Sequence, residues 1–281
     1  MLLITAVVAG VLGLLIGSFL NVVIHRVPAG LSLVRPASRC PSCEAPIRWY
    51  DNIPIVSWLV LRGRCRDCGA PISARYPIVE TLTGVAFVLV ACCFAPGGWL
   101  GGGGDVVAQT IVLVAYLWFA AASIALAAID FDVRRLPDPI VWTTLAVLVV
   151  CFAVAAALRA DLMAIATAVL GGIAMFAVYV VILLVAPRGG MGLGDVKLAA
   201  AIGVATGWIG WSAVAIGWFA AFLIGALVGI GLLAVRRTGR RTAIPFGPWM
   251  LAGAWIGIIA GPAIWAGYAG LVGWPEGGSI G

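Results

Sequence analysis

Apolar stretches long enough to cross a lipid bilayer recur along almost the whole chain. They lie near residues 2–25, 78–95, 106–129, 139–158, 162–186, 196–209, 210–235 and 245–270. Of the 281 residues, 63% are hydrophobic and 10% are charged, and the mean hydropathy is +1.15. A soluble domain of this size could not bury so much apolar surface, so the chain must use lipid as its solvent. We therefore expect an all-α polytopic membrane protein with about eight transmembrane helices, the sixth being the shortest.

The cationic residues follow the alternation that such spans predict. The first apolar stretch lacks the basic region and cleavage site of a signal peptide, so we interpret it as a retained span. If the segment between the first two spans is cytoplasmic, every Lys and Arg except Arg159 falls on that side, as the positive-inside rule requires. This distribution accounts for the net charge of +6 without a nucleic-acid partner. Both termini should then face outward.

The only long polar stretch contains two Cys-x-x-Cys pairs, formed by Cys40, Cys43, Cys65 and Cys68. Each pair supplies two thiolates from one tight turn, and four thiolates suit tetrahedral Zn²⁺. Two disulfides or a redox dithiol are the alternatives, but structural disulfides are rare in the reducing cytoplasm. We favour a structural zinc site, because four thiolates leave no open coordination position for hydrolysis. The domains expected are a first transmembrane helix (1–25), a cytoplasmic zinc-binding insert (26–77) and a transmembrane core (78–281).

Two aspartates lie at the ends of apolar stretches, where carboxylates are costly and usually functional. Asp130 follows about two dozen apolar residues, a typical span length. Asp195 follows Gly192 and Gly194, which remove side chains from its approach. In the predicted topology both aspartates lie at the cytoplasmic membrane edge and can meet. Two adjacent carboxyl groups can share a proton, one acting as base and the other as acid, so the first hypothesis is a membrane-embedded aspartic protease.

Nearby ionisable residues have structural explanations. Asp138 precedes a proline at the start of an apolar run, which is typical of a helix N-cap. Asp132 suits solvated pairing with the arginines that follow it. Asp195 could itself be an N-cap, a role compatible with catalysis, and Lys197 could mark the membrane boundary. Glu80, early in the second span, could pair with an arginine or have a function of its own.

Further motifs complete a family pattern. They are Gly17-Ser-Phe-Leu-Asn-Val22, His25-Arg-Val-Pro28, Trp49-Tyr-Asp-Asn-Ile-Pro54, Ser57-Trp58, Ile72-Ser-Ala-Arg-Tyr-Pro77, Val79-Glu80 and Ile244-Pro-Phe-Gly-Pro248. With the cysteine pairs and the two aspartate segments, they make the sequence resemble, nearly end to end, the bacterial type IV prepilin peptidases. These proteins are also called leader peptidases and N-methyltransferases.

The resemblance implies that Asp130 and Asp195 are the catalytic pair, with Gly192, Gly194 and Lys197 supporting the catalytic loop. It implies cleavage of the basic leader of type IV prepilins or pseudopilins after glycine, at the cytoplasmic face of the bacterial inner membrane. It also implies N-methylation of the new N-terminus from S-adenosylmethionine, with no binding residue assigned. Such enzymes serve type IV pili and type II secretion.

Two alternatives remain. A presenilin-like protease also uses a Gly-x-Gly-Asp aspartate, but it has a Pro-Ala-Leu motif that this chain lacks. A transporter or pilus-assembly scaffold would carry protons on its aspartates, and it predicts graded effects when either aspartate is replaced. A catalytic pair predicts near-complete loss from either replacement.

Overall fold

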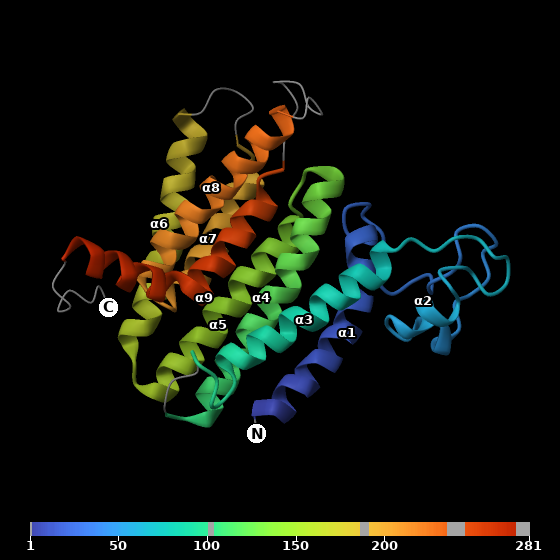
Figure 1. Cartoon of the computed structure of the whole chain (residues 1–281), viewed down its shortest axis with the longest axis horizontal. Coiled ribbons are helices and arrows are strands. Elements are labelled where there is room, and N and C mark those ends of the chain that lie inside the picture. The colour runs from blue at the N-terminus through green and yellow to red at the C-terminus, as the bar shows by residue number, and fades with distance from the viewer. Residues whose placement is uncertain (1, 101–103, 186–190, 235–244, 274–281) are drawn as a thin grey trace. The chain divides into compact units, whose positions relative to one another are not determined.

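The computed structural model describes residues 2–100, 104–185, 191–234 and 245–273, and all regular structure within these ranges is helical (Figure 1). The polar stretch after the first helix holds only a 3₁₀ helix, η1 (Trp49–Asn52), and a short helix, α2 (Val56–Val60). The long helices are α1 (Leu2–Arg26), α3 (Arg75–Phe94), α4 (Val106–Val133), α5 (Asp138–Arg159), α6 (Leu162–Val185), α7 (Leu193–Gly207), α8 (Trp211–Ala234) and α9 (Gly247–Val272).

Seven of the described helices are long and apolar enough to cross a membrane, and α7 is the long helix that is not among them. With 15 residues it extends about 22 Å, short of the roughly 30 Å hydrocarbon core. The prediction of an all-α polytopic protein with a four-cysteine insert between its first two spans is confirmed. The domain boundaries at residues 25 and 77 stay a prediction. Five of the loop cations on which the predicted orientation depends lie outside the described residues: Arg188, Arg236, Arg237, Arg240 and Arg241.

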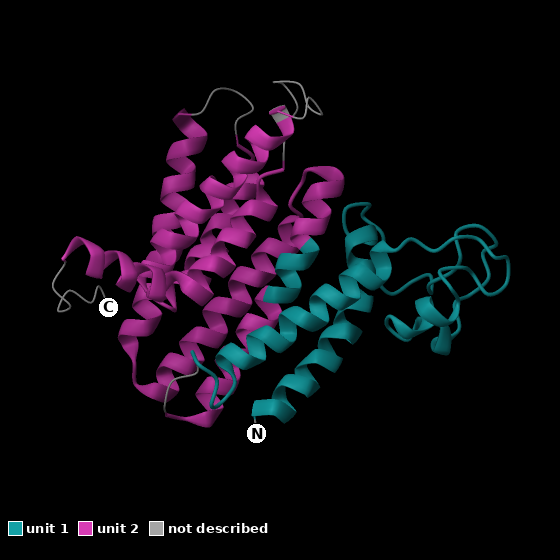
Figure 2. Ribbon diagram, in the orientation of Figure 1, with its two compact units in different colours: residues 1–103, 120–125 teal, residues 104–119, 126–281 magenta. Residues whose placement is uncertain are grey.

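The chain forms two compact units, residues 1–103 with 120–125 and residues 104–119 with 126–281 (Figure 2). In the first unit, α1 packs along α3 through small residues. A Cβ added at Gly13 would lie 2.8 Å from the Cα of Gly84, and one at Gly17 would lie 2.7 Å from the Cα of Glu80. Such close backbone approach is how helices associate in lipid, where burial of apolar surface gives no driving force.

In the second unit, α7 packs against α5, α6, α8 and α9, and most of its residues are buried. Glycines again make the closest contacts. A Cβ at Gly171 of α6 would lie 2.6 Å from the carbonyl oxygen of Gly203 on α7. One at Gly253 of α9 would lie 2.5 Å from the carbonyl oxygen of Gly217 on α8. The short helix is therefore the packed centre of this unit, and it carries Asp195 in its first turn.

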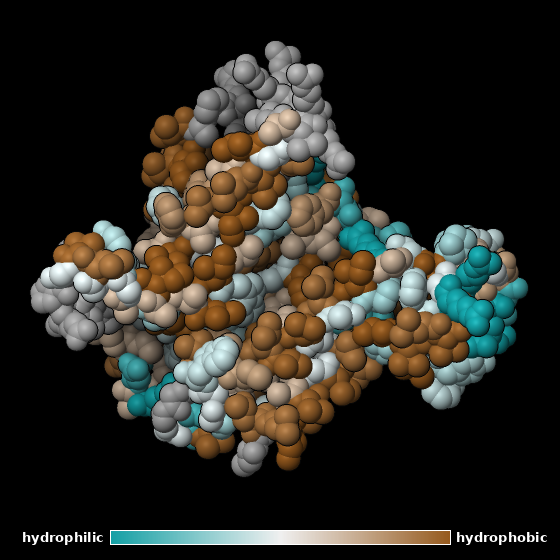
Figure 3. Space-filling model, viewed as in Figure 1, coloured by the Kyte–Doolittle hydropathy of each residue, from teal (hydrophilic) through white to brown (hydrophobic). Residues whose placement is uncertain are grey.

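The outer surfaces of the long helices are apolar. Leu3, Leu184 and Leu271 are each more than three-quarters exposed, and hydrophobic residues cover the helices in Figure 3. Hydrophilic residues gather on the insert between α1 and α3 in the same view. In a bilayer the exposed leucines face lipid, while the helices satisfy their own backbone groups.

Candidate metal centre and aspartate pair

The two Cys-x-x-Cys turns are structural copies of one another. Residues 39–46 and 64–71 share the pattern Arg-Cys-x-x-Cys-x-Ala-Pro. In each turn the N–H of the first cysteine donates to the alanine carbonyl, at 3.0 Å for Cys40 and 2.8 Å for Cys65. The residue after the second cysteine has a positive φ, 58° at Glu44 and 72° at Gly69. Each turn thus presents two sulfur atoms from a closed loop of eight residues.

The four sulfur atoms gather in one cluster. Their Sγ atoms all lie within 4.8 Å of one another, and those of Cys40 and Cys68 are 3.8 Å apart. Zn²⁺ with four bonds of about 2.3 Å in a tetrahedron sets its sulfurs about 3.8 Å apart, so these residues fit the ion. All four are free thiols rather than disulfides.

The thiols of the first turn differ in acidity. Hydrogen bonds from the backbone N–H groups of Cys43 and Ser42 lower the pKa of Cys40 to about 6. The backbone bond from Ala45 lowers the pKa of Cys43, but bonds shared with Cys68 and the other thiols outweigh it and raise the value to about 12. The cluster thus stabilises negative charge at Cys40 in particular. Metal binding requires thiolates, so the whole cluster releases protons as it takes up an ion.

Two arginine–aspartate pairs fasten η1 to the second cysteine turn. The Arg66 guanidinium donates to both carboxylate oxygens of Asp51, at distances down to 2.6 Å. This contact lowers the pKa of the Asp51 carboxyl and raises that of Arg66. Arg48 contacts Asp67 at 3.2 Å. The forked pair at Asp51, which is only 10% exposed, fixes geometry more than an exposed ion pair would.

Asp130 lies in the last turn of α4 and is 5% exposed. Its Oδ2 accepts a hydrogen bond of 3.0 Å from the N–H of Gly247, the first residue of α9. A Cβ at position 247 would lie 2.8 Å from this oxygen, so the approach requires glycine. The positive end of α9 therefore faces the carboxylate. The sequence motif that contains Gly247 does not indicate this contact, because no local signal joins residues 117 apart.

Asp195 is half-buried in the first turn of α7. The helix begins at Leu193, so the sequence-based expectation that Asp195 precedes it is wrong. Gly192, with extended backbone, occupies the N-cap position. The Asp195 carboxylate reaches back and accepts the Gly192 N–H at 3.1 Å. Both aspartates are thus held by backbone donors at helix starts.

Leu136, in the loop between α4 and α5, joins the surroundings of the two aspartates. A Cβ at Gly194 would lie 3.1 Å from the Cβ of Leu136, and one at Gly247 would lie 3.4 Å from its Cδ2. The carboxylates are close enough for the charge of Asp130 to act on Asp195. The structure therefore brings Asp130 and Asp195 together within the second unit.

Lys197 ties the start of α7 to the start of α5. Its Nζ lies 2.8 Å from each carboxylate oxygen of Asp138. Helix α5 begins at Asp138, and Pro137 occupies its N-cap position. The expectation that Asp138 is the N-cap is therefore wrong by one residue. The side chain pairs with the lysine instead. Asp132 is exposed.

Tyr179 of α6 is a residue that sequence reasoning missed. It is fully buried, and its hydroxyl has no hydrogen-bond partner among the described residues. Its ring lies 6.5 Å from that of Phe246, which directly precedes Gly247, and the charge of Asp195 acts on it. A tyrosine within an apolar span is indistinguishable from ordinary core in the sequence. The signal appears only when the fold brings Tyr179 of α6 close to Phe246, just before α9.

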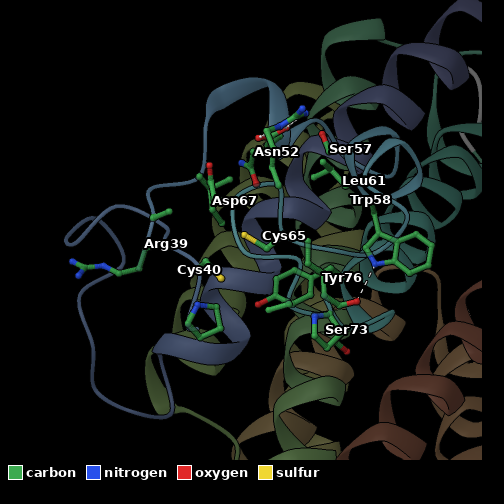
Figure 4. Close-up of a pocket in the computed structure, with 18 of the residues that line it drawn as sticks. Arg39, Cys40, Asn52, Ser57, Trp58, Leu61, Cys65, Asp67, Ser73 and Tyr76 are labelled. Carbon is green, nitrogen blue, oxygen red and sulfur yellow. Dashed lines mark hydrogen bonds and ion pairs between the residues drawn. The ribbon is translucent and has the colours of Figure 1, made fainter. Parts of the chain in front are cut away.

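Glu80 of α3 belongs to a separate cavity in the first unit. Its side chain is 7% exposed, and its Oε2 accepts the N–H of Ile55 at 2.7 Å. Ile55 has a φ of +60°, a strained conformation for a β-branched residue. The cavity has a volume of about 400 Å³ and includes Cys40 and Cys65 in its lining (Figure 4).

Two family models match the chain. The Bacterial Peptidase A24 N-terminal domain matches residues 11–94, and the Type IV leader peptidase family matches residues 117–230. The "Prepilin leader peptidase/N-methyltransferase" of Aeromonas hydrophila is 38% identical over 283 residues, covering 89% of each chain. That of Stutzerimonas stutzeri is 36% identical over 285 residues, covering 92% of this chain and 91% of its own. That of Klebsiella pneumoniae is 41% identical over 211 residues, covering 72% of this chain and 83% of its own. No solved structure matches the chain significantly.

Proposed function

Because the chain belongs to the type IV leader peptidase family, we propose that it is a membrane-embedded aspartic endopeptidase that removes the basic leader of type IV prepilins or pseudopilins. The observation that carries this proposal is geometric: Gly247, whose N–H holds the Asp130 carboxylate, and Gly194, next to Asp195, both lie against Leu136. Cleavage follows a glycine at the cytoplasmic face of the bacterial inner membrane. The substrate's apolar segment stays in lipid there, while its basic leader stays in water.

The chemistry follows from two carboxyl groups that cannot both be charged at close range. One carboxylate takes a proton from water, which attacks the scissile carbonyl. The protonated partner hydrogen-bonds the carbonyl oxygen and then protonates the leaving amine. No covalent enzyme intermediate is formed. The backbone donors at Gly192 and Gly247 keep the carboxylates in place without using another ionisable side chain.

N-methylation of the new N-terminus is the second proposed activity, as the relatives' names suggest. S-adenosylmethionine, when bound, supplies an electrophilic methyl carbon on a sulfonium sulfur. The insert, residues 26–77, is proposed as a zinc-binding domain in the cytoplasm. Cys40, Cys43, Cys65 and Cys68 would hold Zn²⁺ as a structural ion, since four thiolates complete its coordination.

The peptidase proposal is tested with a prepilin that carries a basic leader, a Gly-Phe junction and an apolar helix. We expect Asp130→Asn and Asp195→Asn each to lower its cleavage at least about a thousandfold, because either change removes half of an acid–base pair. The control is Asp132→Asn, at an exposed carboxylate two residues from Asp130. Product mass reports cleavage and one added methyl group. Graded effects of the two asparagine variants would instead support the transporter or scaffold function.

The zinc proposal is tested by elemental analysis of the purified protein. We expect one zinc ion per chain, lost when Cys40 and Cys43 are both replaced by serine, because two ligands cannot hold the ion tightly. Replacing Cys92 and Cys93 in α3 is the matched control. A metal-free wild type whose four insert cysteines resist thiol alkylation until they are reduced would identify disulfides instead.

A further inference from the structure

Sequence motifs that neither the aspartates nor the zinc site explains converge on the cavity of the first unit. The segments are Trp49–Pro54, Ser57–Trp58, Ile72–Pro77 and Glu80, and each contributes residues to the lining. The volume of about 400 Å³ falls within the roughly 300–1,000 Å³ typical of small-molecule sites. Specific binding sites are typically formed in this way, by side chains from segments that are distant in sequence.

The lining favours a ligand that is partly aromatic and positively charged. Trp58, Tyr76 and Leu61 provide apolar and aromatic walls, and Glu80 provides a buried carboxylate. A carboxylate beside hydrocarbon is stabilised by a nearby cation. Aromatic faces bind both cations and planar heterocycles.

The arginines of the lining do not favour an anionic ligand. Arg66 is already paired with Asp51, and Arg39 extends away from the other labelled side chains in Figure 4. A phosphate or another ligand of net negative charge would therefore meet Glu80 with no unpaired cation of the described lining aimed at it.

The walls of the cavity are fixed before any ligand binds. The Trp58 indole Nε1 donates to the carbonyl of Ile72 at 3.2 Å, and its ring lies close to Gly63, where a Cβ would approach it to 3.0 Å. Glu80 is held by the N–H of the strained Ile55. Groups ordered in advance lose little conformational entropy on binding, so this rigidity favours a specific site.

We propose that this cavity binds the methyl donor S-adenosylmethionine, with Glu80 facing its sulfonium cation and Trp58 and Tyr76 packing on its adenine ring. The inference rests on the proposed methyltransferase activity. The zinc site would also contribute to donor binding, because Cys40 and Cys65 line the same cavity. Ordering of the cysteine turns by the metal would then order one wall of the donor site.

The test measures donor binding directly, using the zinc-loaded full chain in lipid nanodiscs and tritiated S-adenosylmethionine. We expect Glu80→Gln to weaken binding at least about tenfold, because the isosteric amide keeps the shape but loses the charge. Binding of S-adenosylhomocysteine, the neutral thioether product, should change much less. Asp132→Asn, at an exposed carboxylate outside the cavity and the cysteine turns, is the control and should leave both affinities unchanged. Zinc content reports the folding of each variant.

Photo-crosslinking of the donor to the wild type locates the site without any substitution. Crosslinked peptides from residues 39–80 support the proposal, and crosslinks confined to other segments overturn it. Equal losses of donor and product affinity in Glu80→Gln would show a structural role for Glu80 and overturn the charge contact. If the wild type methylates prepilin but the donor crosslinks elsewhere, only the assignment of the donor to this cavity is refuted, and the methyltransferase proposal stands. If the wild type cleaves prepilin but neither methylates it nor binds the donor, the methyltransferase function itself is refuted.

Discussion

At the scale of single residues, the aspartate pair is positioned by main-chain groups. Asp130 accepts from Gly247 and Asp195 accepts from Gly192, and each donor lies at the start of a helix. Helix starts carry unpaired N–H groups and a partial positive charge, so they hold carboxylates without a counter-ion. This arrangement fixes both carboxylates while leaving the proton of the pair free to move between them and a water molecule.

The Tyr179 hydroxyl and the Trp249 indole Nε1 are buried groups near this pair that have no hydrogen-bond partner among the described residues. We expect Tyr179→Phe to lower the kcat of prepilin cleavage about a hundredfold with KM changed little, because a buried donor near the aspartate pair would stabilise the developing oxyanion. Steady-state cleavage of the model prepilin provides both constants. A variant with wild-type kcat would remove the hydroxyl from the chemistry.

Tyr116→Phe provides the matched control for this measurement. Tyr116 is also fully buried in the second unit, but its hydroxyl donates to the carbonyl of Ala205 at 2.8 Å. Its loss should cost about 1–2 kcal/mol of stability by leaving that carbonyl unpaired. Turnover per folded molecule should not change. The comparison separates loss of a catalytic hydroxyl from loss of a structural one.

At the scale of helices, the second unit depends on contacts between glycine backbones. Gly203 of α7 faces Gly171 and Gly172 of α6 so closely that any Cβ would overlap their backbone atoms. Because α7 is too short to span the membrane alone, its position is fixed by its neighbours. Displacement of α7 would also move Asp195, which lies two turns earlier on the same helix.

We therefore expect Gly203→Ala to destabilise the protein by about 1–3 kcal/mol, because the added methyl group overpacks a contact that is already at backbone distance. Thermal unfolding in detergent measures the change. Gly231→Ala on α8 is the control, since no atom lies within 4 Å of an added Cβ there. Its effect should be neutral or slightly stabilising, as for other helical glycines. Equal behaviour of the two variants would contradict tight packing between α6 and α7.

At the scale of the whole molecule, the sequence predicts what depends on local composition. Apolar length predicts the long helices, and cysteine spacing predicts the four-thiol cluster, because each signal lies within one segment. The support of Asp130 by Gly247 and of Glu80 by Ile55 is not predictable in this way. These contacts join distant segments, and they form only after the helices have packed. For the same reason Tyr179 looks like core until its neighbours are known.

The predicted orientation can be tested on α5 alone, whose 22 residues extend about 33 Å and so cross the hydrocarbon core. Arg135 precedes this helix and Ala160 follows it, and both are exposed. We expect a membrane-impermeant maleimide to label Ala160→Cys but not Arg135→Cys in intact spheroplasts, measured against the wild-type background. Arg135→Cys should become reactive once the membrane is opened, which shows that its thiol is accessible. Labelling with the opposite sidedness would invert the topology and move the aspartate pair to the outer face, where a cytoplasmic leader could not reach it.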